Sequence, residues 1–229
     1  MSGALFSDME LPVSSLSHCR IGAIVTVQAE GAEYRARIIG TAREKATLRP
    51  FERLSRPSES SLAITLIQSL PKKERMELII QKATELGVAA ILPCTSAKSI
   101  TLSERDARQS KTHRWTTIAA KAAEQSRRRL VPRVEECRDL AGALARGSEA
   151  ELKLILYEKE ADLDLHEFAD RKASSMAIAA GPEGGFTEDE VMLARGHGFV
   201  PVRLGGRILR CETASIAAIS IAQFVWGDL

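Results

Sequence analysis

The sequence predicts an α/β protein in which helices cover both faces of a parallel sheet, preceded by a small β domain. From residue 62 onward, short apolar runs alternate with segments of helical periodicity, which is the pattern of a parallel sheet. Before residue 59, short β-like runs follow one another between turn signals, which favours a small barrel. Two glycine-bearing loops, at 181–185 and 204–214, each leave a short apolar strand and enter a helix. Such loops meet at the carboxyl ends of parallel strands, where α/β proteins bind ligands.

The composition is that of an ordinary globular protein. Of 229 residues, 45% are apolar and 27% charged, and no apolar run reaches the roughly 18–20 residues of a membrane helix. The start of the chain lacks the basic and apolar segments of a signal peptide, so we expect a cytoplasmic protein. The scattered cysteines and histidines argue against a metal site and a disulfide framework. They are Cys19, Cys94, Cys137, Cys211, His18, His113, His166 and His197.

Positive charge is concentrated in one stretch, although the net charge of the chain is only +2. Residues 98–138 hold eleven Lys and Arg against five Asp and Glu, a local net charge of +6. A localised basic surface suggests a polyanionic partner, with nucleic acid the first candidate. The alternative is a solvated helix face.

The first domain is expected over residues 1–58. Residues 1–20 carry little pattern, and β-like runs follow at 22–28, 33–39 and 46–50, separated by turn or charge signals. The polar segment 55–61 then marks a boundary, so the second domain is expected over residues 59–229.

The second domain begins with a strand at 62–70 and a helix from Pro71 to about Leu86, which Gly87 ends. In that helix the apolar residues recur at helical spacing. Further along, the pattern predicts strands at 88–93, near 134, at 152–157 and at 176–180, and helices at 105–128, 140–145, 163–169, from Thr187 and at 214–226.

The first loop, Gly181-Pro182-Glu183-Gly184-Gly185, lacks the spacing of a dinucleotide-binding fold and of a Walker loop. The following helix opens with Thr187-Glu188-Asp189-Glu190, a capping-box pattern with three acids in the first turn. Those acids would repel a phosphate, so a neutral or cationic ligand is favoured. The alternative is a tight turn that only requires glycine backbone angles.

The second loop, Leu204–Ala214, places Arg207 and Arg210 on either side of two apolar residues. Arginines on such a loop can bind an anion or stabilise charge that develops on a base. A structural ion pair between Arg210 and Glu212 is the alternative. A third cluster, at 124–129, ends the basic helix and resembles an ordinary exposed helix end.

Four segments occur together in the order and spacing of one known family: Leu78–Gly87, Glu124-Gln125-x-x-Arg128, Gly181–Gly185 and Leu204–Ala214. The pairing of Gly-Pro-Glu-Gly-Gly with Leu-Gly-x-Arg-Ile-Leu-Arg-x-Glu-Thr-Ala is highly specific. The chain resembles the bacterial 16S ribosomal RNA uracil N3-methyltransferases (RsmE type) of the SPOUT superfamily. The resemblance is strong over residues 60–229 and loose over 20–58.

The resemblance implies a deep trefoil knot in the C-terminal part of the chain, which periodicity does not show. It further implies that both loops bind S-adenosylmethionine, that the protein is a homodimer, and that residues 1–58 form a PUA-like RNA-binding barrel. Family members carry His-x-x-x-Val-Leu-Arg before the first barrel strands. Here Ser17–Ile21 stands near that place, so the barrel is expected to be shortened.

The implied activity is S-adenosylmethionine-dependent methylation of uridine N3 in 16S ribosomal RNA of the small subunit. The alternatives are a SPOUT methyltransferase that acts on another RNA position and a non-catalytic RNA-binding or assembly module. The catalytic prediction is Arg210 supported by Glu212, with no metal. The predicted cofactor-binding residues are Leu156, Gly181, Pro182, Glu183, Gly184, Gly185, Leu204, Gly205, Ile208, Leu209, Thr213 and Ala214. The predicted RNA-binding residues are Lys98, Glu124, Gln125, Arg127, Arg128 and Arg207.

Overall fold

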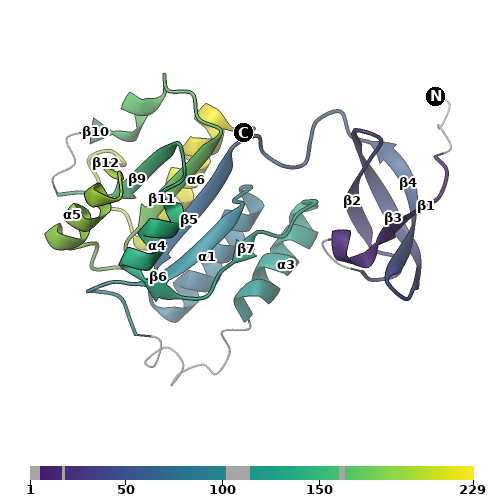
Figure 1. The fold of residues 1–229 in the computed structure, drawn as a ribbon, viewed down its shortest axis with the longest axis horizontal. Helices are drawn as coiled ribbons and strands as arrows, with labels where there is room; N and C mark the ends of the chain where they lie inside the picture. The colour runs from purple at the N-terminus through teal and green to yellow at the C-terminus, as the bar shows by residue number, and fades with distance from the viewer. Residues whose placement is uncertain (1–5, 17–18, 102–113, 160–162) are drawn as a thin grey trace. The chain divides into compact units, whose positions relative to one another are not determined.

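The fold is that of a computed structural model, which describes residues 6–16, 19–101, 114–159 and 163–229 (Figure 1). The chain forms two compact units. One comprises Met1–Glu59 together with Ala120–Val131, and the other comprises Ser60–Ala119 and Pro132–Leu229. The return of residues 120–131 to the N-terminal unit was not part of the predicted division, which follows the chain without interruption.

The N-terminal unit is built on an antiparallel sheet of four strands in the order β1-β4-β3-β2. Its core consists of Val25, Val27, Ala36, Ile38 and Leu48. The strands are β1 (Met9–Pro12), β2 (Ile24–Ala29), β3 (Ala32–Ala42) and β4 (Lys45–Arg53), with a short 3-10 helix, η1 (Val13–Ser15), after the first. Strand β1 corrects the expectation of little structure before residue 20.

The hairpin between β2 and β3 follows from its two turn residues. Ala29 and Ala32 pair across the strands, and Glu30 and Gly31 between them have φ values of 50° and 75°. A two-residue turn with positive φ at both positions matches the right-handed twist of the flanking strands. Glycine at the second position adopts that backbone angle without steric cost.

The second unit contains a parallel sheet in the order β10-β12-β9-β11-β5-β6-β7, with the short strand β8 also paired to β6. Its central strands are buried on both faces and are apolar almost throughout, as parallel strands under helices are. The strands are β5 (Ala63–Ser69), β6 (Ala90–Thr95), β7 (Arg133–Val134), β8 (Arg138–Asp139), β9 (Leu152–Leu156), β10 (Leu163–Asp164), β11 (Ser175–Ala180) and β12 (Val200–Arg203).

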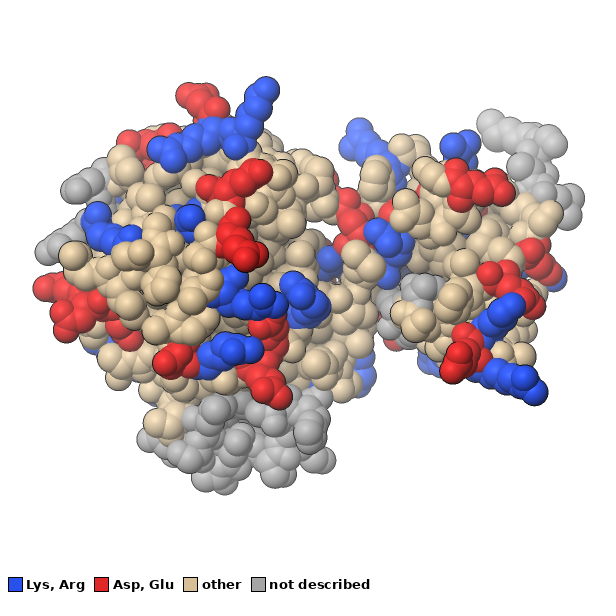
Figure 2. Space-filling model, in the orientation of Figure 1, with Lys and Arg blue, Asp and Glu red and all other residues tan. Residues whose placement is uncertain are grey.

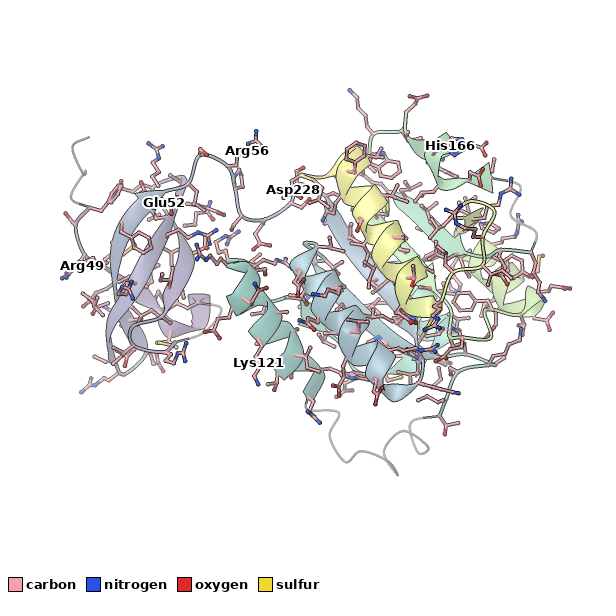
Figure 3. All side chains as sticks on the ribbon, turned by 180° about the vertical axis from the view of Figure 1, so that it is seen from behind. Arg49, Glu52, Arg56, Lys121, His166 and Asp228 are labelled. Atoms are coloured by element: carbon pink, nitrogen blue, oxygen red, sulfur yellow. The ribbon has the colours of Figure 1, made fainter. Side chains whose placement is uncertain are left out.

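Helices cover both faces of this sheet (Figures 1 and 3). Helices α1 (Lys73–Glu85) and α6 (Cys211–Trp226) pack against each other on one face. Helices α4 (Leu140–Gly147) and α5 (Glu188–Gly196) pack on the other, over a core that includes Ile67, Ile155 and Ala179. The predicted α/β class with a helix-covered parallel sheet is therefore confirmed.

One predicted helix differs from the structure, and another is described only in part. Residues 163–169 contain the short strand β10 and the 3-10 helix η2 (Leu165–Phe168) in place of an α-helix, because Leu163 and Asp164 pair with β12. Of the predicted helix 105–128, the described part is α3 (Arg114–Ser126), and residues 105–113 lie outside the described residues. In the described part of the chain, no helix is long and apolar enough to cross a membrane.

Candidate functional site

The two glycine loops form the walls of a cavity of about 300 Å³ in the second unit. It opens beyond the carboxyl ends of β9, β11 and β12, where open parallel sheets bind ligands. All the predicted cofactor-binding residues except Thr213 line it, and so do Arg207 and Arg210. Lining residues outside the predicted set are Arg75, Tyr157, Glu158, Lys159, Phe186, Val202, Arg203 and Cys211.

The first loop is a tight backbone turn between β11 and α5. A Cβ atom on Gly181 would lie 3.2 Å from Gly185 Cα and 3.3 Å from Phe186 N, and Gly185 itself has a φ of +65°. The predicted capping box is present at the start of α5, where Thr187 and Glu190 each accept a hydrogen bond from the other's backbone N–H. The first turn of α5 therefore satisfies its own N–H donors.

A buried glutamine supports this loop from below. Gln68, at the end of β5, donates from Nε2 to the Ser69 carbonyl at 3.0 Å and to the Ala180 and Gly181 carbonyls at 3.4 Å each. Its Oε1 accepts a 2.6 Å hydrogen bond from Ser215 Oγ of α6. Gln68 thus links the first loop to the helix that follows the second loop.

Arg75 of α1 reaches both loops. Its guanidinium lies 3.0 Å from the Glu183 carboxylate of the first loop and 3.6 Å from the Glu212 carboxylate of the second loop. It also approaches Cys211 Sγ at 3.9 Å. Glu183 accepts a further 3.0 Å hydrogen bond from the Lys72 backbone N–H.

The electrostatics of this cluster keep Glu212 ionised and Cys211 protonated. Burial raises the pKa of Glu212, but hydrogen bonds from its own N–H and from Cys211, with the charges of Arg75 and Arg210, outweigh burial and lower it below its ordinary value. Burial and the Glu212 hydrogen bond raise the pKa of the Cys211 thiol to about 11. The thiol can therefore donate to Glu212, 3.3 Å away.

Arg210, at the N-cap of α6, is exposed and lines the cavity. Glu212 pairs with Arg75 and not with Arg210, so the alternative of a structural Arg210–Glu212 ion pair is not what the structure contains. Among the residues that the structure describes, Arg210 has no salt-bridge partner. Its guanidinium can therefore meet an anionic or electron-rich group in the cavity.

Lys98 lies beside the first loop. Its Nζ donates a 3.1 Å hydrogen bond to the Gly184 carbonyl, and its aliphatic carbons occupy the space that a Cβ on Gly184 would need. The neighbouring Ala97 N–H donates to Glu190 at 2.7 Å. Lys98 also borders a second cavity of about 310 Å³, which shares Tyr157, Lys159 and Phe186 with the first.

Comparison with known proteins identifies the family. Residues 58–223 match the family described as RNA methyltransferase domain. A ribosomal RNA small subunit methyltransferase E of Bacillus subtilis is 33% identical over 207 residues, covering 88% of this chain and 81% of the relative. The chain belongs to the ribosomal RNA small subunit methyltransferase E family.

Two solved structures match this chain over nearly its whole length. A methyltransferase E from Neisseria gonorrhoeae, crystallised with S-adenosylmethionine, is 34% identical, has a TM-score of 0.74, and covers 100% of this chain and 96% of its own. A methyltransferase from Legionella pneumophila, also in complex with S-adenosylmethionine, is 33% identical with a TM-score of 0.72, covering 97% and 94%.

The 124–129 cluster of this family member belongs to the N-terminal unit, and none of its residues lines the cavity. The Arg128 side chain is only 6% exposed and lies 2.6 Å from Glu59, so it is corrected from a phosphate contact to part of a buried ion pair. Glu124 pairs with Arg20 at 3.2 Å. Gln125 and Arg127 are exposed, and the Arg127 carbonyl accepts hydrogen bonds from Thr26 and Arg35.

The predicted basic stretch, residues 98–138, is divided between the two units, because residues 120–131 belong to the N-terminal unit and the others to the second unit. On the face in Figure 2, Lys and Arg are interspersed with Asp and Glu on both units. Residues 102–113 of the basic stretch lie outside the described residues. Among the described residues, no group of three His, Cys, Asp or Glu side chains is arranged to hold a metal ion.

Proposed function

We propose that this methyltransferase E family member transfers a methyl group from S-adenosylmethionine to N3 of a uridine in 16S ribosomal RNA of the small subunit. The observation that carries the proposal is the cavity between the two glycine loops, with Arg210 exposed on its lining. Two similar proteins crystallised with S-adenosylmethionine and the name of the Bacillus subtilis relative support it.

The lining of the cavity supports the proposed cofactor. Many of the lining residues are glycines or have apolar side chains, including Leu156, Leu204 and Leu209. The capping box occupies N–H donors of the first turn of α5, so that turn offers no phosphate nest, and Glu183 on the lining can face a cationic sulfonium. Gly181, Gly185 and Gly205 lack a side chain, so the backbone can approach a ligand closely at these positions. Gly185 and Gly205 also have positive φ, which glycine adopts without steric cost. When bound, S-adenosylmethionine supplies the methyl group, and no metal is needed.

The role of Arg210 is to stabilise negative charge on the uracil. N3 of uridine must lose its proton before it can attack, and the charge that remains spreads onto O2 and O4. A guanidinium placed beside one of these oxygens stabilises the anion, and deletion of one such donor typically costs about 3–4 kcal/mol. Hydrogen bonds from its own N–H and from Cys211, with the charges of Arg75 and Arg210, keep Glu212 ionised, and its negative charge supports Arg210.

The RNA must present the uracil out of its stack to reach this cavity. Arg207 lines the cavity and is exposed, and Arg127 and Gln125 are exposed on the N-terminal unit. We assign these three side chains to the RNA surface. Each phosphate contact adds roughly 0.7–0.9 to the slope of log affinity against log salt.

The trefoil knot, the PUA-like barrel and the homodimer are part of the same proposal. After the second loop the chain returns across the sheet, and α6 packs on α1 and β11, which is compatible with a threaded C-terminus. The four-stranded antiparallel sheet supports an N-terminal RNA-binding domain. Leu78 of α1 and Ile221 and Phe224 of α6 are exposed apolar residues on adjacent helices, which favours a second copy covering them. Light scattering of the purified protein measures this directly.

The deciding experiment is methyl transfer from labelled S-adenosylmethionine to naked 16S RNA and to small subunits that lack the modification. Nucleoside mass spectrometry then identifies the product, expected to be 3-methyluridine. Arg210→Ala should lower kcat by about 10²–10³-fold while it still binds S-adenosylhomocysteine. Arg195→Ala, on the exposed side of α5, is the matched control and should retain full activity.

Each other outcome has a definite meaning. Label on a different nucleoside would keep the methyltransferase but overturn the uridine N3 assignment. If the protein binds the cofactor but transfers no methyl group, the assignment of naked 16S RNA or the small subunit as its substrate would be overturned. Absence of S-adenosylhomocysteine binding would leave the alternative of a non-catalytic RNA-binding or assembly module.

A further inference from the structure

Arg75 stands outside both glycine loops, yet it connects them. It belongs to the first turn of α1, whereas Glu183 lies within the first loop, and Cys211 and Glu212 lie in the second loop at the start of α6. Its Nη1 lies 3.0 Å from Glu183 Oε1, and its Nε lies 3.6 Å from Glu212 Oε2. One planar guanidinium therefore serves two carboxylates that are far apart in sequence.

The surroundings make this contact more than a surface ion pair. The Arg75, Glu183 and Glu212 side chains are 32%, 29% and 14% exposed. Without a cation between them, two partly buried carboxylates would repel each other and would have to turn toward water or toward another arginine. Arg210 lies at the N-cap of the same helix, and its charge acts on Glu212.

We propose that Arg75 is a positioning residue that fixes the two cofactor loops relative to each other and keeps Glu212 out of a direct ion pair with Arg210. This inference rests on the function proposed above. It assigns the first and second loops a shared anchor on a third element, and it explains why Arg210 has no salt-bridge partner among the described residues although an acid lies two residues away. Lysine would replace Arg75 poorly, because a single ammonium does not offer the guanidinium fork.

The test is a pair of double-mutant cycles read out by S-adenosylhomocysteine binding. Arg75→Met should weaken the affinity about tenfold, within the range measured for coupled neighbours. In each cycle, with Glu183→Gln and with Glu212→Gln, the double variant should lose no more affinity than Arg75→Met alone. Arg75→Lys should recover only part of the loss. Calorimetry measures the affinities, and far-UV circular dichroism verifies that each variant is folded.

Lys82→Met is the matched control, because it removes a positive charge from the same helix. Lys82 pairs with Glu85 on α1 and not with either loop, so this variant should bind S-adenosylhomocysteine as the wild type does. Additive losses in both cycles, or equal affinity of Arg75→Met and wild type, would overturn the role of Arg75 and leave the proposed function intact. Failure of the wild-type protein to bind S-adenosylhomocysteine would instead overturn the proposed function.

Discussion

Gly181 limits how the first loop can be altered. A methyl group at this position would meet the backbone of Gly185 and Phe186 at 3.2–3.3 Å, and backbone cannot move aside as a side chain can. We expect Gly181→Ala to force the loop open and to weaken S-adenosylhomocysteine binding. Overpacking of this kind costs about 1–3 kcal/mol, or roughly 5- to 150-fold in affinity. Isothermal calorimetry measures it.

Gly206→Ala is the control for this substitution. Gly206 lies in the second loop, a Cβ there would meet no atom within 4 Å, and its backbone φ is not positive. This variant should bind the ligand normally. An equal loss of affinity in both variants would show that the loops respond to any substitution and not to the close approach at Gly181.

Lys98 was predicted to bind RNA phosphate, and its contact with Gly184 gives it a different role to be tested. If Lys98 orients the Gly184 peptide, Lys98→Met should weaken S-adenosylhomocysteine binding a few-fold, as the loss of a hydrogen bond worth about 1 kcal/mol does. The salt dependence of RNA binding should then be unchanged. Lys121→Met, at an exposed position on α3 (Figure 3), should leave cofactor affinity unaltered. A fall of 0.7–0.9 in the salt slope of Lys98→Met would favour the phosphate contact instead.

Sequence patterns located the loop residues of the site but not the residue that connects them. Arg75 falls on the polar side of a periodic helix, where the pattern only predicts that a charged side chain faces outward. Which loop it reaches depends on the sheet order, which periodicity does not contain. Arg128 shows the opposite case. Its place in a run of three arginines predicted an exposed side chain that binds RNA phosphate. In the structure this side chain instead pairs with Glu59, which lies 69 residues earlier in the sequence.

At the scale of elements, the segment that follows α3 is held within the N-terminal unit by the Arg128–Glu59 pair. The side chains are 6% and 14% exposed, and Glu59 also accepts a 2.9 Å hydrogen bond from the Leu130 N–H. Removal of one partner leaves an uncompensated buried charge, which costs about 3–5 kcal/mol. Arg128→Met should therefore destabilise this unit, measured by urea unfolding and by amide exchange in β2–β4.

The double variant Arg128→Met/Glu59→Met tests the physical reason. It replaces both charges with apolar groups, and such replacement of a buried pair is often neutral or stabilising. We expect it to recover most of the stability that the single variant loses. A double variant as unstable as Arg128→Met would contradict the interpretation that the unpaired carboxylate causes the loss.

Helices and strands were predicted correctly where several residues repeat an apolar pattern. The prediction failed where a strand exists only because it pairs with a neighbouring strand. The β2–β3 hairpin and the long strands β5, β9 and β11 have clear apolar runs and turn signals. By contrast β7, β8 and β10 have two residues each, and hydrogen bonds to β6 and β12 define them. No window of two residues carries a periodicity, so a helix was predicted where β10 lies.

For the molecule as a whole, one buried thiol predicts how stability depends on alkaline pH. Cys94 is fully buried in β6, and burial raises its pKa from 9.0 to about 12. The folded-state pKa of Cys94 lies above the unfolded-state pKa. The contribution of the protonated thiol to the free energy of unfolding is therefore fully present below pH 9.0 and is lost as the pH rises toward 12. At pH 10 the loss relative to pH 8 is about 1.4 kcal/mol. Urea unfolding of wild type and Cys94→Ala at both pH values measures this loss. Between pH 8 and pH 10 the free energy of unfolding of the variant should fall by about 1.4 kcal/mol less than that of the wild type. Equal pH dependence in the two proteins would contradict the prediction.

The order of the parallel sheet could not be predicted from the residues alone. Strand β5 lies between β6, the next strand in the chain, and β11, more than a hundred residues further on. Each of these strands is an apolar run that would pair acceptably with several others, and only the tertiary fold selects among them. The resemblance in the motifs supplied that information, because the two loops of the family lie together in space.

The composite N-terminal unit has a consequence for the order of synthesis. Glu59 is made 69 residues before Arg128, and at about 5–20 residues per second the carboxylate waits roughly 3–14 s for its counter-charge. During that interval the four strands have already left the peptidyl-transferase centre, but the segment that neutralises Glu59 has not. The part of the protein that is translated first is therefore completed late, while the chain is still attached to a ribosome.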